Sequence, residues 1–178
     1  MENLLEHPAY SSSTIEFVAV ANESSSFFER STSFEKKDFL SRTAKLLALI
    51  YLKAGMLEEV DFVLEEEPER FVTEEEYEYV RSRIHTLLGN SDAYLEVFHP
   101  DIQLSDEAIA ASISEDIADI YQDLKDFSLR YQTGNNDVMN DALAYCVISF
   151  REYWGQKLTN CLRAIHAALY SQDLAKDE

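Results

Sequence analysis

Basic residues are scarce in this sequence. It contains 15 lysines and arginines against 34 aspartates and glutamates, which gives a formal net charge of −19 over 178 residues. Proteins bind nucleic acids and anionic membrane surfaces through lysine and arginine, so this balance argues against DNA, RNA or a membrane surface as a partner. A basic protein partner, a cation, or solubility alone would each explain the charge.

Cysteines and long apolar runs are also scarce. Two cysteines, Cys146 and Cys161, are too few for a disulfide framework, and they form no CxxC pair of the kind used in zinc or redox sites. The longest apolar run, "LLALIYL" at 46–52, is far shorter than the roughly 18–20 residues that span a bilayer. The N-terminus also lacks the basic start and apolar run of a secretory signal. We therefore expect a cytoplasmic protein.

The length and the aromatic content fit one folded domain. A chain of 178 residues can bury a substantial core. It contains ten Phe, ten Tyr and one Trp, whereas disordered chains are poor in aromatic residues. We predict a single domain over 1–178, with an ordered core at about 13–170 and flexible ends at 1–12 and 171–178.

The few glycines divide the chain into helical segments. Gly55, Gly89 and Gly134 each follow a segment with helical periodicity, where the end of a helix often needs glycine. Helix-start signals, in which a Ser or Thr is followed three positions later by Glu, begin at Ser13, Thr32, Thr73 and Ser112. Together they predict an all-α bundle of five to six helices, at 13–29, 33–54, 74–88, 113–133 and 137–170, the last of them kinked or broken at Gly155.

Three of the predicted helices carry clear core residues. The second includes the run at 46–52, which is apolar on nearly every side and predicts the central, most buried helix. The fourth has an apolar stripe with alternating spacings of four and three: Ile113, Ile117, Ile120, Leu124, Phe127 and Tyr131. The fifth has a similar set: Leu143, Val147, Trp154, Leu158, Cys161, Leu162, Ile165 and Leu169.

Two connections between these helices are unusual. Residues 58–78 hold eleven acidic side chains and one basic one, Arg70, mixed with apolar residues. This acidic loop either covers the bundle's own core or binds a basic, apolar partner. The connection at 90–106 exceeds the usual limit of about 12–15 residues. Its apolar residues predict an ordered path over the bundle, with 94–99 as a short extended piece: Tyr94, Leu95, Val97, Phe98 and Ile102.

Four aspartates form a stripe along the fourth helix, in the stretch "DIADIYQDLKDF" at 116–127. Each one immediately precedes a core residue, so the carboxylates lie on the flank of the apolar face, toward a neighbouring helix. Aspartate is a poor helix former, and like charges three or four residues apart repel each other. We therefore expect a cation nearby, from the protein or a metal. The simplest interpretation is a solvated helix boundary in which some of the aspartates are paired: Asp116, Asp119, Asp123 and Asp126.

A protein cation is available in the last helix. On an ideal helical wheel Arg151 falls inside the apolar face, beside Trp154, and a guanidinium buried there needs a carboxylate partner. The sequence therefore predicts an ion pair between Arg151 and Asp119 or Asp123. Other candidate partners of the stripe, both from the second helix, are Arg42 and Lys45.

A metal site is the alternative. All-α nucleotide pyrophosphatases hold Mg²⁺ with acidic residues three apart on two facing helices, and carboxylates suit Mg²⁺ or Mn²⁺. The same spacing occurs on the helices at 113–133 and 74–88, in Asp116, Asp119, Asp123, Asp126, Glu75 and Glu78. However, no cluster of basic residues is present to bind phosphates. The sequence also lacks GxSxG, HExxH and glycine-rich phosphate loops, so no catalytic or cofactor-binding residue is assigned.

Five stretches together resemble the bacterial family of unknown function DUF5063, common in gut Bacteroidetes. They are "STIEFVAVANE", "LLALIYLKAGML", "ERFVTEEEYE", "SISEDIADIYQDLKDF" and "WGQKLTNCLRAIH". The resemblance implies a compact helical domain in a cytoplasmic bacterial protein, and it supplies no activity, cofactor or partner. The sequence favours a non-enzymatic protein-interaction or adaptor module with an acidic surface. The alternative is a Mg²⁺- or Mn²⁺-dependent hydrolase or pyrophosphatase.

Overall fold

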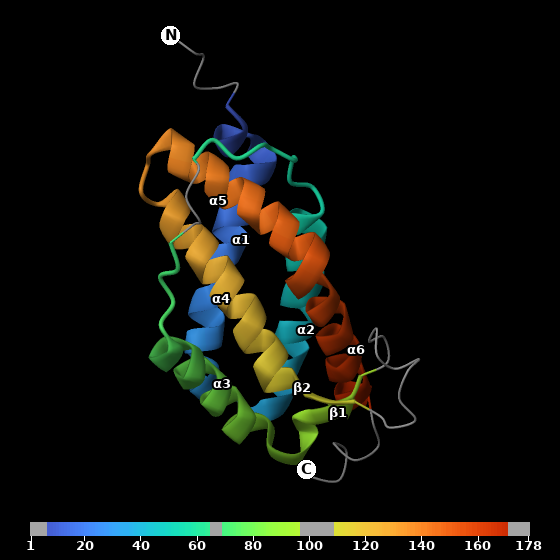
Figure 1. The fold of residues 1–178 in the computed structure, drawn as a ribbon. Helices are drawn as coiled ribbons and strands as arrows, with labels where there is room; N and C mark the ends of the chain where they lie inside the picture. Colours follow the sequence, from blue (N-terminus) through green and yellow to red (C-terminus); the bar gives the residue numbers. More distant parts are fainter. Residues whose placement is uncertain (1–6, 65–68, 97–108, 171–178) are drawn as a thin grey trace.

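The computed structural model describes residues 7–64, 69–96 and 109–170, and Figure 1 shows an elongated helical bundle. Six α-helices lie in these ranges: α1 (Ser12–Glu29), α2 (Lys36–Ala54), α3 (Glu74–Leu88), α4 (Ile113–Tyr131), α5 (Asn136–Ser149) and α6 (Gly155–Tyr170). The predicted all-α fold is confirmed, and most helix bounds lie within a few residues of those expected. No helix in the described ranges is both long and apolar enough to cross a membrane.

The central helix is α4, and the prediction that the second helix is central was wrong. α4 packs against α1, α3, α5 and α6, and its predicted core residues from Ile113 to Phe127 are buried. α2 buries one side, while Leu49 and Leu52 on its other side are 40% and 57% exposed. The prediction failed because the run at 46–52 is also apolar on the face that points outward.

Two of the four predicted helix-start signals work as expected. Thr73 and Glu76 form a complete capping box at the start of α3, and the Ser112 side chain accepts the amide of Glu115 at the start of α4. The cap of α1 is Ser11 and not Ser13. α2 begins after Glu35 without a side-chain cap, because Ser31–Ser33 form a separate 3-10 turn.

A π-helical turn, Phe150–Trp154, joins α5 to α6 in one long rod. A Cβ atom on Gly155 would lie 2.3 Å from the carbonyl oxygen of Phe150, so the backbone can approach this closely only at a glycine. Trp154 is fully buried, with its ring 4.7 Å from that of Phe150. The predicted break at Gly155 is therefore a π-turn, which leaves the rod continuous but changes its register.

A short pair of antiparallel strands lies at the start of α4. β1 (Ala93–Leu95) pairs with β2 (Ala110–Ser112), which confirms an extended piece at the start of 94–99. β2 was not predicted, because its sequence "AAS" lacks the β-branched and aromatic residues typical of strands. Tyr94 is half-buried as expected, but Leu95 is 62% exposed. The remaining predicted contacts lie outside the described residues: Val97, Phe98 and Ile102.

The ordered structure begins before the predicted boundary at residue 13. Pro8–Tyr10 form a 3-10 turn in which Ala9 is fully buried. The Tyr131 hydroxyl donates a hydrogen bond to the Ala9 carbonyl oxygen at 2.7 Å, which ties this turn to the end of α4. The rest of the predicted flexible ends, 1–6 and 171–178, lies outside the described residues.

Candidate functional site

The aspartate stripe of α4 divides into two pairs with different surroundings. Asp116 and Asp119 meet tyrosines and a lysine from β1, α3 and the rod that ends in α6, and we call them the sealed pair. Asp123 and Asp126 border an open pocket, and we call them the pocket pair. The pairs are described in turn below, because the chemistry available to each differs.

Asp116 is almost completely enclosed. Its carboxylate accepts a hydrogen bond from the Tyr94 hydroxyl at 2.5 Å, and the Lys157 ammonium lies 3.8 Å away. Burial raises the pKa of Asp116 to about 7, although the Tyr94 hydrogen bond and the Lys157 charge act in the opposite direction. Asp116 therefore changes its charge near neutral pH.

Asp119 sits one turn further along and has three donors. The hydroxyls of Tyr77 and Tyr153 donate to its two oxygens at 2.8 and 3.0 Å, and the Lys157 ammonium lies 2.8 Å away. Burial alone would lower the pKa of Lys157, but the hydrogen bond and ion pair with Asp119 raise it overall. Lys157 therefore stays charged and serves both aspartates of the sealed pair. With these three donors, Asp119 holds α4 against α3 and the rod.

The cation that meets the sealed pair is Lys157, and the predicted pairing of Arg151 with Asp119 or Asp123 was wrong. Arg151 pairs instead with Glu59, and both side chains are largely exposed. The wheel that placed Arg151 inward assumed a regular helix, whereas the π-turn adds a residue to this turn and rotates Arg151 outward. One usable signal was present: Lys157 immediately precedes the core residue Leu158, just as each aspartate precedes its own core residue.

The other predicted partners are also elsewhere. Arg42 forms an exposed ion pair with Asp38 at 2.9 Å, one turn back on α2, and Lys45 is exposed on the same helix. Both therefore belong to the outer face of α2 and not to the boundary of α4.

Asp126, in the pocket pair, fixes the end of the acidic loop. One of its oxygens accepts the backbone amides of both Phe71 and Val72 at 2.8 Å, and its side chain is 5% exposed. One turn later, Arg130 donates to the carbonyl oxygen of Glu69 at 2.7 Å. The last residues before α3 are thus attached directly to α4.

Asp123 has a simpler environment. It accepts a hydrogen bond from the Ser149 hydroxyl at 2.7 Å. Burial raises the pKa of Asp123 to about 6; the Ser149 hydrogen bond lowers it, the nearby Asp126 raises it, and the charge of Arg70 lowers it. A further positive charge close to Asp123 would therefore lower its pKa again, as Arg70 does.

An open pocket of about 370 Å³ lies beside the pocket pair, where α4, the end of α5, the π-turn and the end of the acidic loop meet. Its walls combine carboxylates, aromatic rings and one aliphatic side chain: Arg70, Gln122, Asp123, Asp126, Tyr145, Ile148, Ser149, Glu152 and Tyr153. π-helical turns often occur at functional sites. Carboxylates beside tyrosine rings suit a cationic group that also carries an apolar stem.

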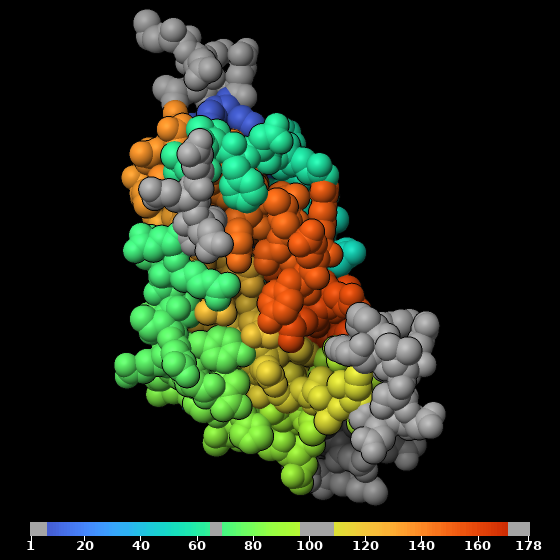
Figure 2. Space-filling view, in the orientation of Figure 1, coloured from blue at the N-terminus to red at the C-terminus, as the bar shows by residue number. Residues whose placement is uncertain are grey.

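The surface around this pocket is acidic and also contains exposed apolar side chains. Figure 2 shows the segment around 69–80 in green meeting the rod around 145–158 in orange on one face of the molecule. The exposed apolar residues near these segments include Phe71, Ile148 and Tyr153, which are 37%, 42% and 47% exposed. Further along the acidic loop the exposed residues are Phe62, Val63 and Leu64.

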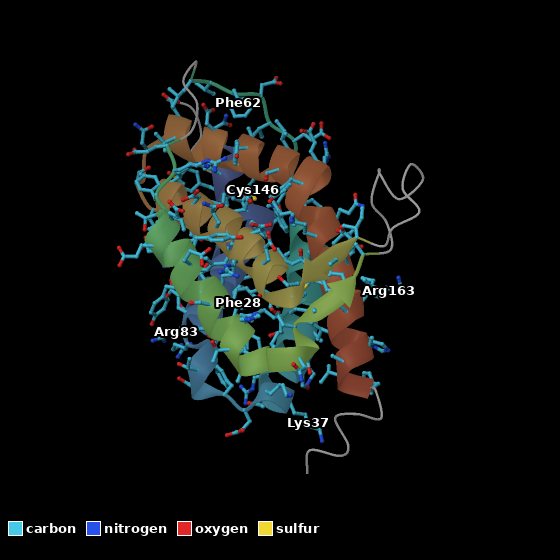
Figure 3. The ribbon with its side chains drawn as sticks, turned by 60° about the horizontal axis from the view of Figure 1, so that its bottom comes forward. Phe28, Lys37, Phe62, Arg83, Cys146 and Arg163 are labelled. Atoms are coloured by element: carbon cyan, nitrogen blue, oxygen red, sulfur yellow. The ribbon has the colours of Figure 1, made fainter. Side chains whose placement is uncertain are left out.

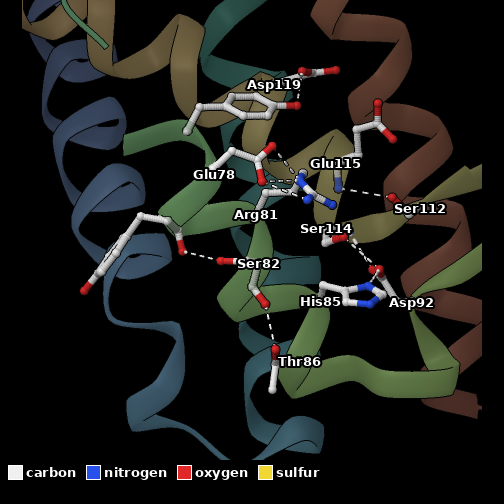
Figure 4. A network of polar contacts seen from close by, with 12 residues as sticks. Glu78, Arg81, Ser82, His85, Thr86, Asp92, Ser112, Ser114, Glu115 and Asp119 are labelled. Atoms are coloured by element: carbon white, nitrogen blue, oxygen red, sulfur yellow. Dashed lines mark hydrogen bonds and ion pairs between the residues drawn. The ribbon is translucent and has the colours of Figure 1, made fainter. Parts of the chain in front are cut away.

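Two buried aspartates outside the stripe anchor other loops and were missed by the sequence analysis. Asp141 of α5 accepts the amides of Val63 and Leu64 at 2.7 and 2.9 Å, which holds the acidic loop against the bundle. Asp92 accepts the amide and hydroxyl of Ser114 at 2.7 Å and lies 2.7 Å from a ring nitrogen of His85 (Figure 4). Neither residue lies in a recognisable motif, so nothing in their spacing indicates these roles.

The acidic residues proposed as metal ligands do not come together. Glu75 is exposed, and Glu78 pairs with Arg81 at 2.8 Å on the surface of α3 (Figure 4). Across residues 7–64, 69–96 and 109–170, no group of three or more His, Cys, Asp or Glu side chains is placed to hold a metal ion. The carboxylates of the stripe instead meet hydroxyl, amide and ammonium donors.

Comparisons with known proteins place this architecture in a family. The family model described as a domain of unknown function, DUF5063, matches residues 8–171. The crystal structure of protein BF1032 from Bacteroides fragilis is similar, with 43% sequence identity, a TM-score of 0.81, and coverage of 92% of this chain and 96% of that chain. None of the curated proteins matches the chain. Because the family model and the similar structure both span nearly the whole chain, this protein belongs to the DUF5063 family.

Proposed function

We propose that the protein is a non-enzymatic interaction module of the cytoplasm, and that it binds a basic segment of a partner protein at the acidic pocket beside Asp123. The observation that carries the proposal is the pocket itself, whose walls include the carboxylates of Asp123 and Glu152 and the rings of Tyr145 and Tyr153. A lysine or arginine side chain would place its charge against the carboxylates and its aliphatic stem against Ile148.

An internal arginine supports this preference. Arg70 of the acidic loop lines the same pocket, and its charge lowers the pKa of Asp123. Arg70 therefore already places one positive charge at the wall of this pocket. A partner's basic residue would bind beside Arg70 or in its place, and the exposed Ile148, Tyr153 and Phe71 would add apolar contacts around the charge.

The cysteines fit a reducing compartment. Cys146 and Cys161 are free thiols and both are buried; Figure 3 shows Cys146 inside the bundle. Burial raises the pKa of both thiols, so they are unreactive core residues rather than nucleophiles. Such an arrangement needs no disulfide chemistry and supports a cytoplasmic protein.

A peptide titration tests the proposal. A tetra-arginine peptide with blocked ends, added to the ¹⁵N-labelled protein, should shift the amide signals of residues 119–126 and 145–153. Glu152→Lys should weaken this binding by about tenfold, because it reverses a charge in the pocket wall. Glu23→Lys on the exposed side of α1 changes the net charge equally and should leave the same signals responding. Equal weakening by both variants would mean that the peptide senses only the overall charge, and no shifts at these amides would reject the pocket as a binding site.

The metal-dependent hydrolase is less well supported by the geometry, because Glu78 is paired with Arg81 and the sealed pair with Lys157. A thermal-shift series with millimolar Mg²⁺, Mn²⁺ or EDTA tests it directly. We expect no change in Tm with either metal, whereas a rise in Tm reversed by EDTA would favour the hydrolase.

A further inference from the structure

The acidic loop carries one basic residue, and that residue lies at the pocket. Arg70 is the only lysine or arginine between residues 58 and 78, where eleven side chains are acidic. It lines the pocket together with Asp123, Asp126 and Glu152. A positive charge in this place reduces the negative charge that a partner's basic segment would meet. Arg70 therefore bears directly on what the pocket binds.

The backbone on both sides of Arg70 is fixed by α4. Before it, the carbonyl oxygen of Glu69 accepts a hydrogen bond from Arg130 at 2.7 Å. After it, one oxygen of Asp126 accepts the amides of the next two residues at 2.8 Å. Asp126 and Arg130 lie about one turn apart on α4, so together they hold this end of the loop along the helix. The backbone of Arg70 thus stays at the pocket without help from its own side chain.

The side chain of Arg70, in contrast, is not held. It is exposed, and across residues 7–64, 69–96 and 109–170 its guanidinium forms no ion pair or hydrogen bond. Its charge lowers the pKa of Asp123, which attracts it, and also lowers the pKa of Arg130, which repels it. A charge that is near a carboxylate but exposed and unpaired contributes little to stability. The guanidinium can therefore be displaced at low cost.

We propose that Arg70 is an internal competitor for the pocket, whose guanidinium takes the place beside Asp123 that a basic side chain of the partner takes in the complex. This inference rests on the proposed function and adds how the same site is regulated. Because the backbone at residues 69–72 stays attached to α4, displacement needs only a change of side-chain rotamer. A partner segment with several anchors, basic or apolar, displaces Arg70 more readily than an isolated basic side chain does.

Arg70→Gln tests the competition, because glutamine is polar and removes the charge. Titration with the blocked tetra-arginine peptide, followed at the amides of 119–126 and 145–153, should show binding about fourfold tighter than in the unsubstituted protein. Lys45→Gln on the exposed side of α2 removes the same charge and should tighten binding less than about 1.5-fold at physiological salt. Equal tightening by the two variants would overturn the competitor, because the peptide would then sense only the net charge.

Asp123→Asn tests where the competition takes place. Asparagine removes the negative charge but keeps an acceptor for the Ser149 hydroxyl. Arg70→Gln should therefore tighten peptide binding in the unsubstituted protein and leave it nearly unchanged when Asp123→Asn is also present. The same tightening in both backgrounds would overturn the place assigned to the guanidinium beside Asp123.

A measurement without peptide separates this inference from the proposed function. Carboxyl ¹³C titration should show that Arg70→Gln raises the pKa of Asp123 and that Lys45→Gln does not. An unchanged pKa of Asp123 in Arg70→Gln, or peptide binding that is equally tight with and without Arg70, would overturn the competitor and leave the proposed binding at the pocket standing. No peptide shift at these amides in either protein would reject the proposed function, and the competitor with it.

Discussion

Asp116 and Asp123 lie two turns apart on α4, and each immediately precedes a core residue, yet their surroundings differ. Burial raises the pKa of both, to about 7 and about 6. Asp116 is closed in by Tyr94 and Lys157, whereas Asp123 meets the Ser149 hydroxyl and borders an open pocket. The position of a side chain relative to the core therefore sets its burial, and the neighbouring elements decide whether it stabilises the fold or is accessible to a partner.

Asp126 tests how far the pocket pair contributes to stability, and its replacement should have the largest effect. Asp126→Ala removes the acceptor shared by two backbone amides, those of the exposed Phe71 and the buried Val72. We expect the free energy of unfolding to fall by about 3 kcal/mol, measured by urea denaturation. Glu23→Ala on the exposed side of α1 should change it by less than about 0.5 kcal/mol. Equal values for the two variants would show that the acidic loop does not depend on this anchor.

Much of the fold could be predicted because its signals are local. Helical periodicity and the capping box at Thr73 depend only on neighbouring residues, and both were read correctly. Each aspartate of the stripe immediately precedes a core residue, and Lys157 precedes the core residue Leu158 in the same way. The sequence therefore contained a signal for the cation of the sealed pair. The assignment of Arg151 failed because a π-turn cannot be recognised from periodicity alone.

The misplaced centre of the bundle has a different cause. Apolar residues on the outside of α2 look the same in sequence as apolar residues in a core, and only the packing of the other helices separates them. The loop anchors Asp92 and Asp141 depend on contacts between distant segments. The pocket likewise forms where α4, the rod and the acidic loop meet, and no single stretch of sequence contains it.

Replacing Lys157, the cation of the sealed pair, should cost stability to an extent that depends on pH. The folded pKa of Asp116 is raised above the ordinary value of 3.8, so the folded state binds more protons between about pH 4 and 7, and this group's contribution to stability falls as the pH rises through that window. Lys157→Met removes the positive charge that stabilises ionised Asp116 and so limits this loss of stability. We expect a cost of about 2 kcal/mol near pH 8 and a smaller cost near pH 5, where Asp116 is protonated.

Lys125 provides a matched control for this variant. Its side chain is 29% exposed, against 28% for Lys157, but its partner Glu29 is 34% exposed. Lys125→Met should therefore cost less than about 1 kcal/mol. Urea denaturation of both variants near pH 5 and pH 8 measures the difference, and equal costs for Lys157→Met at the two pH values would mean that Lys157 stabilises the fold through Asp119 alone.

The smallest change removes the hydroxyl group that donates a hydrogen bond to Asp116 or to Asp123. Tyr94→Phe and Ser149→Ala should both raise the pKa of the aspartate concerned, because each hydroxyl stabilises the charged carboxylate. Near pH 8, Tyr94→Phe should lower the free energy of unfolding by about 1.5 kcal/mol, since the enclosed Asp116 would keep only the Lys157 ammonium, 3.8 Å away. Ser149→Ala should cost about 0.5 kcal/mol, since water in the pocket can replace the hydroxyl beside Asp123. Carboxyl ¹³C titration and urea denaturation measure the two effects, and a Ser149→Ala cost as large as that of Tyr94→Phe would mean that Asp123 is closed to water and to a partner's charge alike.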